Sequence, residues 1–150
     1  MKLLLLTHFA ATMFMTGVIW FVQVVHYPLF SRAQGDGFVS YAASHGRLTT
    51  WVVAPPMFVE LLTGALLLWL CWQRPEELGL LRLPTAIGFA LILIIWLSTF
   101  LLQVPQHNIL GTSFEAAAHR TLVLTNWVRT AAWTLRSVLV LWMVAAMIKE

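Results

Sequence analysis

Four long apolar segments dominate this 150-residue chain and restrict what it can fold into. They cover residues 3–25, 51–72, 84–104 and 129–148. As a helix with a rise of about 1.5 Å per residue, each is long enough to cross about 30 Å of hydrocarbon. The first segment is too long for the core of a secretion signal, and no convincing cleavage site of small residues follows it. The sequence therefore predicts a single all-α domain, an integral membrane four-helix bundle.

The composition calls for a solvent other than water. Hydrophobic residues make up 60% of the chain and charged residues 10%, with a mean hydropathy of +0.82; soluble domains carry about 25% charged residues. We expect the lipid bilayer to cover this surface. The net charge of +3 comes from scattered Lys and Arg residues, so we expect no nucleic-acid partner. The single cysteine, Cys71, excludes an intrachain disulfide and is expected to be a packed thiol.

The segments next to the spans also carry information. Residues 113–118 resemble a capped helix start, and a helix running unbroken from there through the fourth span would be about 50 Å long. Pro55 and Pro56 lie just before Glu60. They favour either a distorted turn beside a site or a plain helix start with proline in its first turn. No internal repeat stands out along the chain.

Positive charges do not decide the orientation in the membrane. An even number of spans places both termini on one side. The terminal side carries four positive residues: Lys2, Arg74, Arg82 and Lys149. The opposite side also carries four: Arg32, Arg47, Arg120 and Arg129. The positive-inside count is therefore equal. Because the second set lies in segments with functional character, we expect the termini to face the cytoplasm, in a bacterial cytoplasmic membrane.

Four of the five histidines fall at the end of the bundle opposite the termini. His26 ends the first span and His45 precedes the second. His107 follows the third span, and His119 precedes the fourth. Only His8 lies near the terminal end. Histidines that are scattered in sequence but gathered at one end of a bundle predict a functional site there.

Ionisable residues within the spans indicate a polar interior. From the histidine end, Glu60 lies about 13 Å into the second span and Arg136 about 10 Å into the fourth. An unpaired charge at such a depth costs several kcal/mol, so we expect these two residues to meet. Two interpretations stay open, a buried ion pair and a Glu60 carboxylate at the floor of a cavity, and both can hold together. One polar stripe on the fourth helix supports this interior: Glu115, His119, Asn126, Arg129 and Arg136.

Five residues are candidate metal ligands: His26, His45, Glu60, His107 and His119. Imidazole and carboxylate donors of this kind suit iron, copper or zinc. No pair among them has a compact ligand spacing. Haem held by two histidines, and a site without any cofactor, remain as alternatives.

Two stretches are similar to a known family. Residues 103–108 (QVPQHN) and 126–136 (NWVRTAAWTLR) resemble the signatures of small four-helix membrane proteins that include the anthrone oxygenase-like proteins. The first helix end, His26-Tyr27-Pro28, and the segment from Pro55 to Glu60 also fit bacterial members. The resemblance spans most of the chain. It implies an oxygenase that acts on a planar, apolar aromatic substrate.

The implied reaction suggests roles for particular residues. In anthrone oxidation a base removes an acidic C–H proton, and the anion reacts with dioxygen. His107 is the first candidate for the base. Arg129 and Arg136 are candidates to stabilise the oxyanion, and Asn126 to orient the substrate. Tyr27 and Trp127 are candidates to flank a flat ring.

The expected function is therefore a membrane-embedded, oxygenase-like oxidoreductase acting on a lipophilic aromatic small molecule. A metal held by the His and Glu cluster is its main mechanistic variant. Two other classes stay open. The first alternative is a non-catalytic accessory or haem-binding subunit of a larger membrane complex. The second is a transporter or proton path through Glu60, Arg136 and His119, which would need a homo-oligomer.

Overall fold

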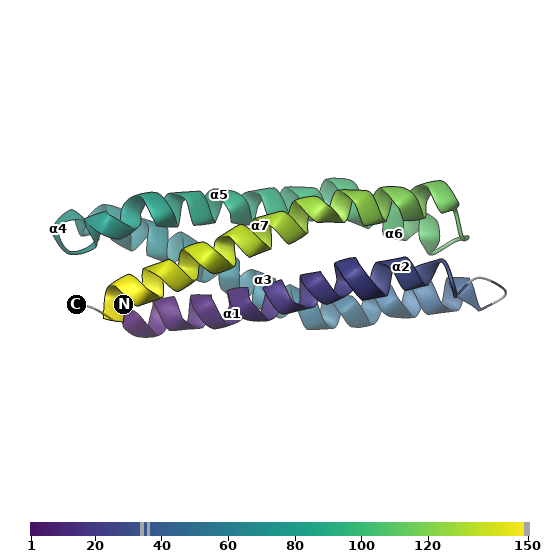
Figure 1. The fold of residues 1–150 in the computed structure, drawn as a ribbon, viewed down its shortest axis with the longest axis horizontal. Helices are drawn as coiled ribbons and strands as arrows, with labels where there is room; N and C mark the ends of the chain where they lie inside the picture. The colour runs from purple at the N-terminus through teal and green to yellow at the C-terminus, as the bar shows by residue number, and fades with distance from the viewer. Residues whose placement is uncertain (34, 36, 149–150) are drawn as a thin grey trace.

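Four helical rods lie side by side in the computed structural model, which describes residues 1–33, 35 and 37–148 (Figure 1). The first rod comprises α1 (Lys2–Phe21), η1 (Val22–His26) and α2 (Tyr27–Phe30). The second is α3 (Phe38–Gln73), and the fourth is α7 (Ala116–Ile148). The third comprises α4 (Pro75–Leu78), η2 (Gly79–Leu81), α5 (Arg82–Ser98), η3 (Thr99–Gln103) and α6 (Val104–Leu110). Each rod is long and apolar enough to cross a membrane, which confirms the predicted four-helix bundle.

The rods are longer than the predicted spans. The second begins at Phe38 rather than at residue 51, and the third extends from Pro75 to Leu110. A helix of the length of α3, 36 residues, measures about 54 Å. Since α7 begins at Ala116 and continues to Ile148, the expected long unbroken fourth helix is confirmed. The start of α1 and the end of α7 lie at the same end of the bundle (Figure 1).

Pro55 and Pro56 lie inside α3, so the expected helix start at these prolines is wrong. Proline cannot donate a backbone hydrogen bond to the carbonyl four residues earlier, and it bends the helix that contains it. Figure 1 shows α3 changing direction near its middle. As a result, this one helix packs against both α1 and α5.

Two π-helical turns occur toward the end of the bundle opposite the termini. In the first, Tyr27 N–H donates to the Val22 carbonyl; in the second, Val104 N–H donates to the Thr99 carbonyl. A proline follows each closing residue directly: Pro28 and Pro105. Because these prolines leave the usual carbonyl without a donor, a wider turn before them costs little. Such turns inside helices often mark functional sites.

The two halves of the chain repeat each other at a spacing of 76 residues. The segment LTTWV at residues 48–52 returns as LTNWV at residues 124–128. Residues buried in one half correspond to residues buried in the other: Leu5 and Leu81, Ile19 and Ile95, Ala42 and Ala118, Glu60 and Arg136, Leu67 and Met143. The two halves therefore share a burial pattern, although no repeat stands out in the sequence itself. Because few residues are identical, the repeat becomes clear only when burial is compared.

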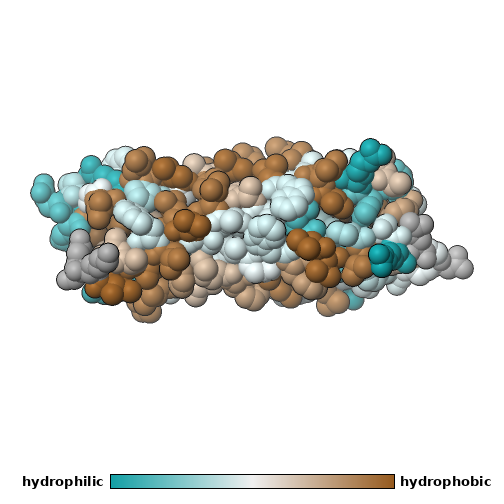
Figure 2. All heavy atoms as spheres, in the orientation of Figure 1, coloured by the Kyte–Doolittle hydropathy of each residue, from teal (hydrophilic) through white to brown (hydrophobic). Residues whose placement is uncertain are grey.

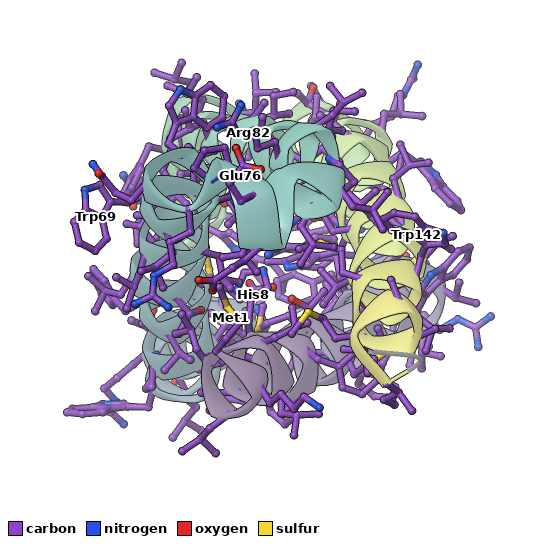
Figure 3. All side chains as sticks on the ribbon, turned by 90° about the vertical axis from the view of Figure 1, so that its left-hand side faces the viewer. Met1, His8, Trp69, Glu76, Arg82 and Trp142 are labelled. Atoms are coloured by element: carbon purple, nitrogen blue, oxygen red, sulfur yellow. The ribbon has the colours of Figure 1, made fainter. Side chains whose placement is uncertain are left out.

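The rods form a four-cornered arrangement in which α1 and α5 each contact both α3 and α7. Figure 3, viewed from the terminal end, shows α3 and α7 facing each other across the bundle, with His8 in the interior. Trp69 and Trp142 point outward. Brown, hydrophobic side chains cover most of the surface between the ends, and teal ones gather at both ends (Figure 2). This surface is consistent with an integral membrane protein. Cys71 is fully buried, which confirms a packed thiol.

Candidate functional site

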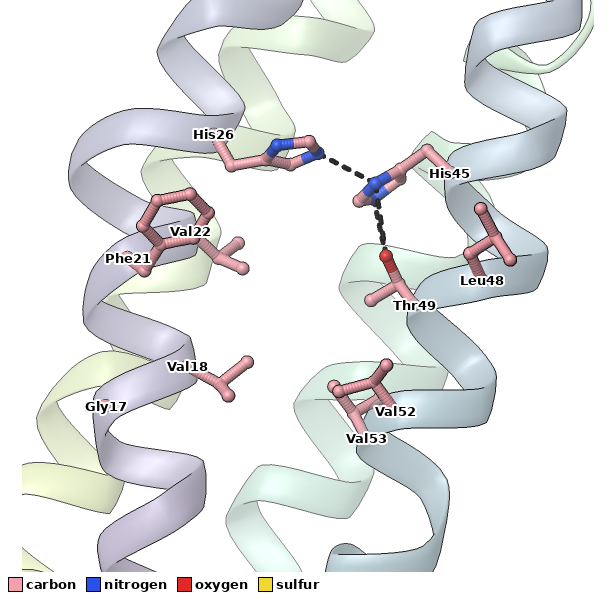
Figure 4. Close-up of a pocket in the computed structure, with 10 residues that line it drawn as sticks. All are labelled: Gly17, Val18, Phe21, Val22, His26, His45, Leu48, Thr49, Val52 and Val53. Atoms are coloured by element: carbon pink, nitrogen blue, oxygen red, sulfur yellow. Dashed lines mark hydrogen bonds between the residues drawn. The ribbon is translucent and has the colours of Figure 1, made fainter.

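Three of the four histidines at the far end converge. His26 ends the first π turn, His45 lies in α3, and His107 lies in α6. The His26 Nε2 and His45 Nδ1 atoms are 2.7 Å apart and share a hydrogen bond, and Thr49 Oγ1 lies 3.1 Å from the same His45 nitrogen (Figure 4). The ring centroids of His45 and His107 are 5.5 Å apart. Side chains from three different rods therefore form one histidine cluster.

Tyr27 and Arg129 complete this cluster from the inside. The Tyr27 hydroxyl is 3.0 Å from His107 Nε2. Arg129, in α7, interacts with Tyr27, and its guanidinium lies 5.3 Å from the centre of the Trp133 ring. Arg129 and Tyr27 are both buried. All four rods thus contribute a side chain to one polar centre.

His119 and Asn126 support this centre without facing an open space. His119 Nε2 donates to the Tyr27 carbonyl over 2.7 Å. The Asn126 amide donates to Gln23 Oε1 over 2.8 Å, and its oxygen accepts from Arg129 Nη1 over 3.3 Å. Asn126 is fully buried. Its contacts position Arg129, whereas its expected role was to orient a substrate.

An apolar groove with a volume of about 450 Å³ lies between the first rod and α3. Figure 4 shows it with the hydrogen-bonded His26 and His45 at one end and Gly17 at the other. Phe21, Leu48 and Val52 on its walls are each more than half exposed. Because exposed apolar residues of these rods face lipid, the groove opens sideways toward the bilayer.

A smaller cavity of about 140 Å³ lies on the inner side of the groove. His45, His107, Tyr27 and Arg129 give it polar walls, and Gly46 also lines it. The groove and the cavity share five lining residues: Val18, Val22, His45, Thr49 and Val53. His45 and Thr49 are the polar residues of this shared wall, so they lie between the lipid-facing space and Arg129.

A second polar network lies deeper in the bundle. Arg136 Nη1 and Glu60 Oε1 are 2.6 Å apart, so the expected meeting of these residues is confirmed. Trp133 Nε1 donates to the same carboxylate, at 3.1 Å from Oε2. Arg136 Nη2 lies 3.3 Å from both His8 Nε2 and Thr12 Oγ1. None of these residues lines the groove or the cavity. The ion-pair interpretation is therefore confirmed, and Glu60 lines neither the groove nor the inner cavity.

The predicted site residues consequently divide into two groups. His107 and Arg129 share the cavity, whereas Arg136 belongs to the deeper network. Of the five candidate metal ligands, His26, His45 and His107 lie together, while Glu60 and His119 are engaged elsewhere.

The part of the chain that the structure describes contains no group of three or more His, Cys, Asp or Glu side chains placed to hold a metal ion. The spacing of the histidines gives one reason. Two nitrogens bound to one tetrahedral metal at about 2 Å each lie about 3.3 Å apart, whereas those of His26 and His45 are closer and share a proton.

Sequence reasoning missed several residues that shape the site. Gln23 and Trp133 link the helices through buried hydrogen bonds. Gly17 and Gly46 line the two spaces, and a Cβ atom added at either would meet no other atom within 4 Å. Pro28, which closely follows His26, and Pro105, which closely precedes His107, were the available signal for the π turns.

Comparisons with protein-family models, with curated proteins and with solved structures gave no match to this chain.

Proposed function

We propose that this protein is a membrane-embedded, oxygenase-like oxidoreductase that takes a lipophilic aromatic small molecule from the bilayer. The observation that carries the proposal is the continuity of the lipid-facing groove with the histidine cluster. A ligand in the groove would lie along apolar walls and meet His26 and His45 at one end. The resemblance of residues 103–108 and 126–136 to anthrone oxygenase-like proteins supports the same reaction class.

The sizes of the two spaces support different contents for each. Sites for small organic molecules usually measure about 300–1,000 Å³, a range that includes the groove but not the cavity. The aromatic ring system therefore belongs in the groove. The cavity has room for only a few atoms, such as dioxygen or an oxygen substituent of the ring.

With the ring system in the groove, the proposed general base is His45 and not His107. His45 lines both spaces, whereas His107 lines only the cavity. His45 removes a C–H proton that the aromatic carbonyl has made acidic, and the hydrogen bond to His26 accommodates that proton. Arg129 stabilises the negative charge that develops on oxygen. In total, a ring CH₂ group and dioxygen give a ring carbonyl and water, so carbon is oxidised and dioxygen is fully reduced.

Iron or copper on the histidine cluster is the metal-dependent variant of this proposal. It would require His26 and His45 to separate and exchange their mutual hydrogen bond for two metal bonds. Metal analysis of the purified protein tests it. Stoichiometric iron or copper that disappears in the His45→Gln protein would support the metal-dependent mechanism. Activity in a metal-free preparation would exclude that mechanism.

We also propose that the termini face the cytoplasm of a bacterial membrane. Arg129 is buried inside the bundle, so it is a poor topology marker, and Lys149 lies outside the described residues. Apart from Arg129, the sequence places four positive residues at the terminal end, namely Lys2, Arg74, Arg82 and Lys149. It places three at the opposite end, namely Arg32, Arg47 and Arg120. Labelling of single cysteines placed at residue 76 or residue 112, in a Cys71→Ser background, would report which end is accessible from outside the cell.

The main test is oxidation of anthrone by the purified protein in neutral detergent. Formation of anthraquinone and consumption of dioxygen are followed together, and their ratio should be one. We expect His45→Gln to lower the rate at least 100-fold, in the range typical of a general base. Arg120→Gln changes an exposed residue on α7 and serves as the control.

Gly17→Leu tests the substrate path separately. The added side chain extends into the groove without meeting another atom at its Cβ, so it should raise the KM for anthrone. A folded wild-type protein without anthrone oxidation, or a His45→Gln variant at the wild-type rate, contradicts the proposal. Co-purification with other membrane proteins would then favour the accessory-subunit class.

A further inference from the structure

Arg129 is a buried cation without an acidic partner. Only 7% of its surface is exposed. The acidic residues that the structure describes are Glu60, Glu76, Glu77 and Glu115, and none of them forms an ion pair with Arg129. Arg136, the other buried arginine, has the Glu60 carboxylate at 2.6 Å. A buried charge without a counter-charge costs several kcal/mol, and this cost favours any anion that can reach it.

The guanidinium of Arg129 also retains unused hydrogen-bonding capacity. It carries five N–H donors. Nη1 donates to Asn126, and the guanidinium interacts with Tyr27 and the Trp133 ring. The Nε atoms of Arg129 and Arg136 are both buried and without a hydrogen-bond partner, but of these two residues only Arg129 lines the inner cavity. An unpartnered polar atom on a buried cation points to a ligand that accepts hydrogen bonds.

The 140 Å³ cavity provides the space for such a ligand. Arg129 lines it together with two histidines and the Tyr27 hydroxyl, all of which can donate a hydrogen bond to an anion. Gly46 leaves part of its wall without a side chain. The cavity is therefore a small space next to a positive charge, with donors from all four rods.

We propose that the inner cavity is an anion-binding site that takes a carboxylate or another small oxygen anion onto Arg129. The anion comes from one of two sources. It is either a free small anion or the carboxylate head of a lipophilic acid whose apolar part lies in the adjoining groove. The inference rests on the charge and the space around Arg129, and it does not depend on the oxygenase reaction.

The test measures the thermal unfolding midpoint of the purified protein in neutral detergent. Sodium formate or sodium decanoate is titrated at constant ionic strength against sodium gluconate, whose anion is too large for the cavity. We expect formate to raise the midpoint in a saturable way. Arg129→Gln should abolish this rise, and Arg120→Gln, on the exposed part of the same helix, should retain it.

Two glycine variants distinguish the sources and guard against a variant that does not fold. Gly46→Leu fills the cavity while keeping Arg129, so it should abolish the response to both anions. Gly17→Leu fills only the groove. If decanoate acts at a concentration at least tenfold lower than formate, and loses this advantage in Gly17→Leu, the ligand is a lipophilic acid. If formate and decanoate act equally, it is a free small anion.

Two results would overturn the inference. One is a wild-type midpoint that responds to neither anion at constant ionic strength. The other is an unchanged response in Arg129→Gln and Gly46→Leu. Neither result involves anthrone, so the anion site and the proposed oxygenase reaction succeed or fail separately.

Discussion

Glu60 and Arg136 occupy equivalent positions in the two halves of the chain, and they pair with each other across the bundle. Their Oε1 and Nη1 atoms are 2.6 Å apart, and the two side chains are 3% and 0% exposed. A charge pair at this depth is held by hydrogen bonds as well as by attraction, because Trp133, His8 and Thr12 bond to one partner or the other. The pair therefore ties α3 to α7, two helices that do not pack directly over most of their length.

Removing one member of this pair should destabilise the protein strongly. We expect Glu60→Gln to lower the free energy of unfolding by roughly 3 to 5 kcal/mol, because it leaves Arg136 charged and buried. Glu60→Gln combined with Arg136→Met should cost less than the two single changes added together. Unfolding by denaturant in mixed detergents measures all three variants. The exposed pair of Arg74 and Glu77 provides the control, and Arg74→Gln should cost less than about 1 kcal/mol.

Trp133 links the deep ion pair to the cavity. Trp133→Phe removes the N–H that donates to Glu60 but keeps a ring beside Arg129. We expect a loss of roughly 1 to 3 kcal/mol of stability, the cost of an unsatisfied buried acceptor, with formate binding retained. Trp142→Phe, on an outward-facing side chain, should change neither property. Equal effects of the two variants on stability would show that the indole hydrogen bond contributes nothing.

Gly64 in α3 packs closely against Ile92 of α5. A Cβ atom at this position would lie 2.7 Å from Ile92 Cδ1 and 3.3 Å from His8 Cε1. Gly64→Ala should therefore cost roughly 1 to 3 kcal/mol through overpacking. Adding Ile92→Val removes the opposing methyl group and should restore part of the loss. Gly17→Ala, where the added atom meets nothing, should cause no loss and should raise stability by about 0.5 to 1 kcal/mol, because alanine favours the helix over glycine.

Helix number and the histidine end were predictable from sequence because both depend on local patterns. Apolar length alone predicted four helices. Because consecutive spans run in opposite directions, His26 and His45 at the first connection and His107 at the third were predicted at the same end. Depth along each helix also predicted the meeting of Glu60 and Arg136, since unpaired charges inside an apolar bundle are costly.

The division of the site into two networks was not predictable in the same way. Placing Arg129 at the cavity and Arg136 away from it depends on which direction each side chain leaves α7, and on the bend that Pro55 and Pro56 introduce in α3. Residues seven apart share a helix stripe, but they lie about 10 Å apart along the axis. One stripe can therefore serve two separate centres.

The correspondence between the two halves of the chain raises the question of why the histidine site occurs in only one half of the bundle. Two identical helical hairpins paired around a twofold axis would present every residue twice, so any pocket beside the axis would occur in duplicate. In this chain the equivalents of Arg129 and His45 are Val53 and Thr121. Joining both hairpins in one polypeptide allows each copy to carry a different residue at the same position. The groove beside Val18, Phe21 and Val52 thus has an apolar counterpart beside Ile94, Leu97 and Val128, whereas the histidine cluster and Arg129 lie only beside the first. The covalent link therefore lets corresponding helices carry different polar side chains.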